Sequence, residues 1–137
     1  MADHNFQLPT PDPSTQEYWD AACRHELLIK RCGSCEAAHF YPRPFCPHCW
    51  STDVHWEVAS GKGVVYTYSV VRRNDLPAFA SRVPYVPAIV ELHEGPRMMA
   101  NVVGVDPSSV RIGMEVHVDF APAGEDGEAL IPVFCPA

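Results

Sequence analysis

The stretch CGSCEAAHFYPRPFCPHC, residues 32–49, holds four cysteines in two CxxC pairs that are ten residues apart. In a CxxC pair the two intervening residues turn the chain so that both sulfurs face one point, and Gly33 is expected to ease the first turn. Four thiolates suit the tetrahedral geometry and soft-ligand preference of zinc. The predicted zinc ligands are Cys32, Cys35, Cys46 and Cys49.

Other readings of these cysteines are a rubredoxin-like iron centre that carries one electron, and a thiol redox pair. His48, inside the second pair, could replace a thiolate as a ligand, although its spacing favours an exposed position. A closed four-sulfur site leaves no coordination position for water or substrate, so the pattern favours structural zinc. Cys23 and Cys135 lie outside the cluster and are expected to be small buried groups.

The whole chain limits the possible classes of protein. Its 137 residues allow one ordinary domain, or two small modules of which one is held by metal. The net charge of -7 counts against nucleic acid as a ligand. No apolar run approaches the ~18 residues of a membrane span, and the start lacks a signal-peptide pattern. We therefore expect a cytoplasmic protein, where CxxC pairs favour metal or redox chemistry over disulfides.

Residues 1–30 are predicted to form an extended arm followed by a helix. Prolines at 9, 11 and 13 prevent an early helix, whereas Ser14 and Glu17 match a capping box for a helix that ends near His25. The apolar run from Glu26 favours a strand that leads into a ribbon over residues 31–57. Two prolines between the cysteine pairs exclude a regular helix there.

Residues 58–137 carry β-type patterns. The first strand predicts Val64, Tyr66, Tyr68 and Val70 on one face and Val65, Thr67, Ser69 and Val71 on the other. Asp106 and Pro107 predict one helical turn, and Pro132 an edge or closure point. The expected strands are 61–73, 85–94, 97–105, 114–120 and 129–134. This mainly β layout indicates a five-stranded oligonucleotide/oligosaccharide-binding (OB) barrel, with an SH3-like barrel as the alternative.

The sequence contains no GxSxG, HExxH, Walker or GxGxxG motif. His93 and His117 fall at strand positions that indicate a solvent-facing side, and Tyr66 and Tyr68 suit a barrel wall better than base stacking. A loose basic cluster flanks the loop NDLPAFASRVP. It is either a solvated rim or a contact for a phosphorylated ligand or a partner. Its members are Arg72, Arg73 and Arg82.

Between residue ~14 and 135 the chain carries, in this order, the segments YW, LLIKRC, CGSC, FYPRPFCPHC, GKGVVYTYSVV, PYVPAIVEL, DPSSVRIGMEVHVDF and IPVF. In these segments and their order the chain resembles the acyl-CoA-associated zinc-ribbon plus OB-fold family. The resemblance implies a small non-catalytic partner of thiolase-like proteins. These include thiolases, acyl-condensing synthases and steroid-CoA aldolases. It further implies that the chain packs on the partner and helps to form the channel for the CoA thioester.

The aromatic side chains are expected to face such a partner, together with the arm from Phe6 to Pro13, because a small monomer could not easily bury them all. The predicted contacts are Tyr18, Trp19, Phe40, Tyr41 and Phe45. Three alternatives are open: a zinc-ribbon/OB nucleic-acid binder, a rubredoxin-like electron carrier, and an enzyme that acts on acyl-CoA by itself. The net charge and the outward Glu115 and Asp119 count against the nucleic-acid binder.

Overall fold

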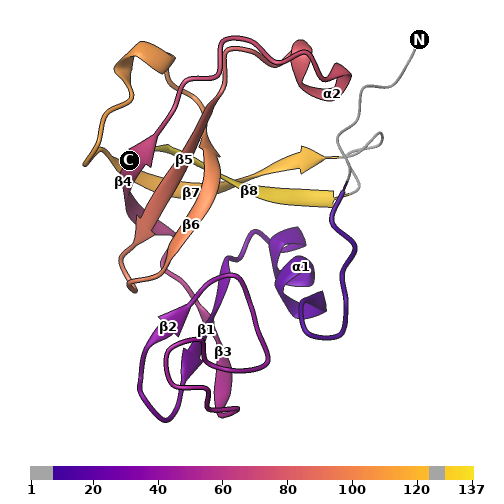
Figure 1. The fold of residues 1–137 in the computed structure, drawn as a ribbon, viewed down its shortest axis with the longest axis vertical. Helices are drawn as coiled ribbons and strands as arrows, with labels where there is room; N and C mark the ends of the chain where they lie inside the picture. Colours follow the sequence, from indigo (N-terminus) through magenta and orange to yellow (C-terminus); the bar gives the residue numbers. More distant parts are fainter. Residues whose placement is uncertain (1–7, 124–128) are drawn as a thin grey trace.

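The computed structural model describes residues 8–123 and 129–137. One helix precedes a three-stranded sheet of order β2-β1-β3 and a closed barrel of order β4-β5-β6-β8-β7 (Figure 1). Phe6 of the predicted arm lies outside the described residues, as do residues 124–128 before the last predicted strand. Within the described ranges, no helix has the length and apolar character needed to cross a membrane.

Helix α1 spans Gln16–Cys23 and begins differently from the prediction. Ser14 does not cap the helix. Instead the Asp12 carboxylate accepts hydrogen bonds from the Ser14 backbone N–H at 2.9 Å and the Ser14 hydroxyl at 2.7 Å. The buried side chains of α1 are Tyr18, Ala21 and Ala22, at helical spacing. Cys23 lies outside this stripe and is exposed, so the expectation of a buried thiol was wrong.

The ribbon sheet is antiparallel and consists of β1 (Leu28–Cys32), β2 (Ala38–His39) and β3 (Val54–Val58). It therefore starts three residues before the predicted module boundary at 31. Lys30 pairs with both neighbouring strands, and its ammonium lies 4.1 Å from the centre of the Trp56 ring. Leu28 and Ile29 are buried in the same core as Tyr18, which joins the ribbon to the rest of the molecule.

The barrel consists of β4 (Lys62–Tyr68), β5 (Val86–Leu92), β6 (Arg97–Val102), β7 (Glu115–Ala123) and β8 (Ala129–Pro136). It closes through antiparallel β4–β7 pairing and a parallel contact in which Val102 of β6 faces Phe134 of β8. This arrangement confirms the OB barrel over the SH3-like alternative. The 3-10 helix η1 (Pro107–Ser109) lies between β6 and β7. As predicted, Asp106 caps it by accepting from the Ser108 N–H at 2.9 Å.

The predicted faces of the first barrel strand required a correction. A bulge between Val65 and Thr67 shifts the β4–β5 register by one residue. Because an inserted residue reverses the alternation, the inward set changes from Val65 before the bulge to Tyr68 and Val70 after it. Tyr66, at the bulge, remains 47 % exposed with the Arg97 guanidinium 3.8 Å from its ring centre.

Strand β7 alternates as predicted. Val116 and Phe120 are buried in the main core, whereas Glu115, His117 and Asp119 are exposed. Beyond the barrel, β7 and β8 continue as a paired hairpin in which Pro132 faces Phe120. This hairpin runs towards α1 (Figure 1), so the helix, the hairpin and the ribbon meet in one region.

Candidate metal centre and contact surfaces

The four predicted ligands converge at one end of the ribbon. The sulfurs of Cys32, Cys35, Cys46 and Cys49 all lie within 4.8 Å of one another. The Sγ–Sγ distances of Cys32 to Cys49 and of Cys35 to Cys46 are both 3.6 Å. Tetrahedral zinc with bonds of about 2.3 Å requires sulfurs about 3.8 Å apart, so this arrangement fits zinc. The His48 side chain is exposed and lies outside the cluster, which leaves a four-sulfur site.

Backbone N–H groups help to hold the thiolates. The Cys32 sulfur accepts from the N–H groups of Ser34 and Cys35, at 3.3 and 3.4 Å, and the Cys46 sulfur accepts from the N–H of His48 at 3.3 Å. The Cys35 N–H is the largest cause that lowers the pKa of Cys32 to about 6. For Cys49 the Ser51 N–H acts in the same direction, but desolvation and the neighbouring thiols together raise its pKa to about 12. Four thiolates so close together require a cation.

Gly33 has a different role from the predicted one. A Cβ at this position would collide with the side-chain carboxylate of Asp53, and the Gly33 N–H donates to the Asp53 carbonyl at 2.7 Å. The absence of a Cβ therefore leaves room for the Asp53 side chain beside the turn of the first CxxC pair, which we call the first knuckle. Gly33 is not among the glycines with positive φ, so the turn does not use the left-handed backbone that glycine allows.

Four of the predicted contact residues line one groove. A cavity of about 350 Å³ lies between α1, the ribbon and the barrel, with Tyr18, Trp19, Phe40 and Tyr41 on one side and β6 and β8 on the other. The Trp19 Nε1–H donates to the Tyr41 hydroxyl at 3.0 Å. The barrel side includes Met99, which is 70 % exposed. The groove is thus lined mainly by apolar groups that the chain itself does not cover.

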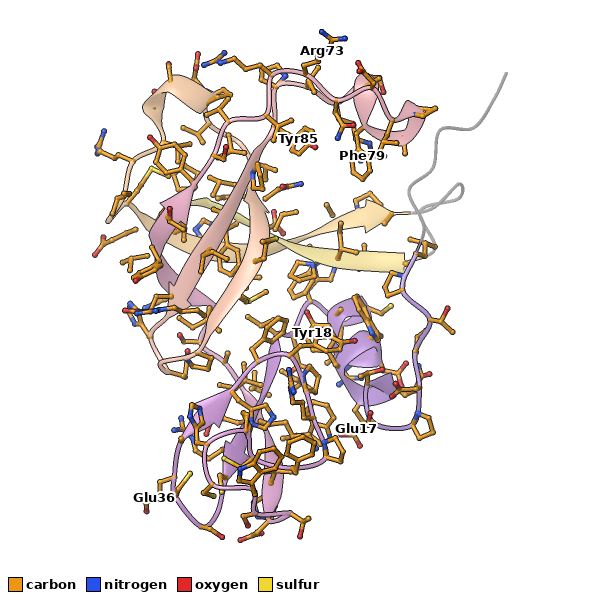
Figure 2. All side chains as sticks on the ribbon, in the orientation of Figure 1. Glu17, Tyr18, Glu36, Arg73, Phe79 and Tyr85 are labelled. Carbon is orange, nitrogen blue, oxygen red and sulfur yellow. The ribbon has the colours of Figure 1, made fainter. Side chains whose placement is uncertain are left out.

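Tyr18 supports this groove from below. It is 2 % exposed and lies on the side of α1 that faces the barrel and the ribbon (Figure 2). Its ring is 4.8 to 5.6 Å from the rings of Trp19, Tyr41 and Phe40. Because Tyr18 has almost no free surface, it contributes to the chain's own core and offers a partner little contact. Burial also raises its pKa well above the usual value for tyrosine.

Phe45 lies elsewhere, in the ribbon. Its ring stacks on Trp50, with ring centres 5.3 Å apart and planes within 9°. Trp50 is 75 % exposed, and sequence reasoning missed it. A tryptophan directly after a CxxC pair was the available signal, since this position of a knuckle is a turn.

The three predicted arginines lie in the loop between β4 and β5, which contains α2 (Pro77–Ala80). All three are exposed. Arg73 pairs with Asp75 at 3.2 Å, and the Arg82 Nε–H donates to the Ala78 carbonyl at 3.0 Å. Figure 2 places Arg73 at the opposite end of the molecule from Glu36 of the ribbon, so the arginines and the ribbon aromatics form separate surfaces.

A mainly apolar cavity of about 400 Å³ lies beside this loop, with Phe79, Arg82 and Tyr85 contributing from the loop. The Phe79 and Tyr85 rings are 6.1 Å apart. On the outside of the barrel, His93 and His117 are exposed as predicted. Cys135 is half-buried, and burial raises the pKa of its thiol.

A four-sulfur zinc ribbon followed by a closed OB barrel defines a two-module class of protein with a structural metal. Two family models match in the same order: "ChsH2, rubredoxin-like zinc ribbon domain" over residues 19–55, and "ChsH2, C-terminal OB-fold domain" over residues 56–121. A "DUF35 domain-containing scaffold protein" of Methanocaldococcus jannaschii is 42 % identical over 106 residues, covering 77 % of this chain and 74 % of the relative. The chain belongs to the DUF35 family.

A solved structure described as "Ltp2-ChsH2(DUF35) aldolase" includes a chain 40 % identical to this one, with a TM-score of 0.81 over 94 % of this chain and 98 % of that chain. A "Probable enoyl-CoA hydratase alpha subunit" of Thermomonospora curvata is 43 % identical over 120 residues, which are 88 % of this chain. The present chain spans only 36 % of that relative's length. A DUF35 structure from Sulfolobus solfataricus, with 14 % identity and a TM-score of 0.61, shares the fold.

Proposed function

We propose that this chain is a non-catalytic accessory subunit of a thiolase-type enzyme that forms or cleaves carbon–carbon bonds on CoA thioesters. The apolar groove between α1, the ribbon and the barrel carries this proposal. It leaves Met99 70 % and Tyr41 39 % exposed in a chain of this size. Uncovered apolar patches of this kind mark interaction sites. The relative named as part of an aldolase, and those named as scaffold proteins, support a subunit role.

The groove has the composition of a protein interface. Trp and Tyr are enriched at interface centres, and their polar tips are already paired through the Trp19–Tyr41 hydrogen bond. Met99 adds an adaptable thioether side chain, which can pack against irregular partner surfaces. Because Tyr18 holds the aromatic side of the groove in place, the surface is preorganised and little entropy is lost on docking.

The CoA thioester is expected to pass near the β4–β5 loop. Exposed Arg72, Arg73 and Arg82 offer guanidinium groups to phosphates, and the neighbouring cavity of about 400 Å³ offers apolar walls to an acyl group. The zinc supplies structural stability to the ribbon and takes no part in the reaction, since all four coordination positions are occupied by sulfur. None of the six cysteines, which all lie within the described residues, forms a disulfide, and this supports a cytoplasmic complex.

The test is affinity for a thiolase-like protein recovered with the tagged chain from its own cells. Met99→Ala should raise the Kd at least tenfold, because it removes an exposed side chain from the groove. Ile112→Ala is the matched control, since Ile112 is 69 % exposed but lies in the turn before β7. It should change the Kd less than twofold. Equal Kd values for both variants would remove the groove from the interface.

Activity provides a second test of the accessory role. The purified chain should not turn over an acyl-CoA, whereas addition of the thiolase-like partner should give activity. Turnover by the chain alone, free of any thiolase contaminant, would make it an enzyme in its own right.

A further inference from the structure

The Phe45–Trp50 stack forms a surface separate from the groove. Trp50 is not among the groove-lining residues, and it sits directly after the second CxxC pair. Its N–H donates to the Cys46 carbonyl at 2.9 Å. The equivalent residue of the first knuckle is Glu36, whose N–H donates to the Cys32 carbonyl at 3.0 Å. The two knuckles therefore make the same turn, with different side chains at the last position.

This turn requires a left-handed backbone. Trp50 has φ of 68° and Glu36 has φ of 66°, a conformation that glycine adopts most easily. A bulky aromatic residue at positive φ is uncommon and strained. Stacking on Phe45 offsets part of that strain, but the indole is still 75 % exposed. Stability of the free chain does not account for tryptophan at this position, and such outliers point to function.

With zinc bound, the surroundings of Trp50 carry more negative than permanent positive charge. Residues 32–56 contain two acidic residues, Glu36 and Asp53, against one arginine, no lysine and three histidines, of which His55 pairs with Asp53 at 2.6 Å. Four thiolates around one divalent ion add about two further negative charges. The Ser34 and Ser51 hydroxyls are 2.8 Å apart, which holds the Trp50 turn against the first knuckle. The exposed residues Cys35 and Cys49 belong to this same end of the ribbon.

An exposed indole face in a negative field is a site for a cation, and tryptophan is the strongest aromatic partner for one. Among protein side chains, the planar guanidinium of arginine both stacks on an aromatic ring and carries a permanent charge. We propose that the Phe45–Trp50 stack is a second docking point on this chain, which receives an arginine side chain of the partner subunit on the free face of Trp50. This inference rests on the proposed accessory role.

The two knuckles provide a matched experiment. Trp50→Gly removes the backbone strain that a bulky residue has at positive φ. The zinc content and the unfolding midpoint of the ribbon should therefore stay at or above those of the wild type. The Kd for the co-purified thiolase-like partner should nevertheless rise at least tenfold. Glu36→Gly relieves the same backbone strain without removing an aromatic ring, and should keep the Kd within about threefold. A Kd for Trp50→Gly within twofold of the wild type would overturn the proposal.

The chemical class of the occupant is tested separately by NMR. Nα-acetyl-arginine amide should shift the Trp50 indole N–H signal, which is assigned by its loss in Trp50→Gly. Nα-acetyl-citrulline amide has nearly the same shape without the charge and should shift it at most one-fifth as much. Equal shifts would reject a cation site. If Met99→Ala weakens the complex and Trp50→Gly does not, the accessory role stands and this inference fails. Absence of any thiolase-like partner would refute the accessory role itself.

Discussion

The barrel and residues 33–53 of the ribbon, the distal ribbon, are each stabilised by a different physical interaction. In the barrel, the side chains of Val65, Val90, Val116 and Phe134 are at most 1 % exposed and fill one apolar core. In residues 33–53 of the ribbon, only His39, Pro42 and Cys46 are buried. Apolar burial therefore stabilises the barrel, whereas the distal ribbon depends on its metal, as expected for a segment too small for its own core.

This contrast explains where the proposed contact surfaces lie. A metal-held segment does not need its aromatic side chains for a core, so Phe45 and Trp50 can remain at the surface without loss of the fold. Leu28 and Ile29, at the start of β1, belong instead to the core that contains Tyr18. The change from apolar to metal-based stabilisation thus occurs within β1, between Ile29 and Cys32.

Loss of the metal should give the largest effect. Cys32→Ser, or a strong chelator, removes metal binding of about 10–16 kcal/mol and should unfold residues 33–53. The barrel should remain folded, with its amide signals unchanged in NMR spectra. Cys23→Ser is the control, because Cys23 is exposed and outside the cluster, and it should keep both the zinc and the ribbon. Simultaneous unfolding of the barrel would mean that the two regions share one cooperative unit.

Removal of equivalent rings from the two regions should have unequal costs. Phe134→Ala leaves a cavity at the point where β6 and β8 close the barrel, and should lower the free energy of unfolding by about 3–5 kcal/mol. Phe45→Ala removes only a half-buried stack and should cost about 0.5–1.5 kcal/mol with zinc retained. Denaturant unfolding measures both. Comparable losses would show that the ribbon has an aromatic core of its own.

The sequence was sufficient wherever one local rule determines the structure. CxxC spacing identified the four ligands, strict alternation identified Val116 and Phe120 as inward, and Asp106 was identified as a cap. It was insufficient where a distant segment decides. The β-bulge after Val65 depends on pairing with β5, and the neighbour that fills the space beside Gly33 is the distant Asp53.

The proposed contact surfaces were predictable only in composition. Aromatic content indicated an interface, but only the fold separates Trp19, Phe40 and Tyr41 at the groove from Phe45 at the ribbon stack. Tyr18 and Trp19 are adjacent in sequence and both line the groove, yet Tyr18 is buried in the core whereas Trp19 is only partly buried. Their positions around α1 decide this, since neighbouring helical residues point about 100° apart.

The smallest effect concerns His39, which is 4 % exposed in the ribbon and lines a groove shared with the β5–β6 hairpin. Burial lowers the pKa of His39 below the usual 6.5, and its interactions with Lys30, His48 and Arg43 act in the same direction. Below pH 6.5 the unfolded chain therefore binds this proton more readily than the folded chain. Stability contributed by neutral His39 should accordingly be complete above pH 6.5 and decrease as the pH falls through that value.

His39→Gln tests this sign, because a glutamine oxygen can accept from the Arg43 N–H, as the His39 Nε2 does at 3.3 Å, but cannot titrate. Zinc-loaded protein would be unfolded between about pH 5.5 and 7.5, where thiolate protonation affects wild type and variant alike. The stability of His39→Gln should decrease less on acidification than that of the wild type. The control His93→Gln, at an exposed barrel position, should follow the wild type. Parallel curves for wild type and His39→Gln would show that His39 gains its proton without cost to stability.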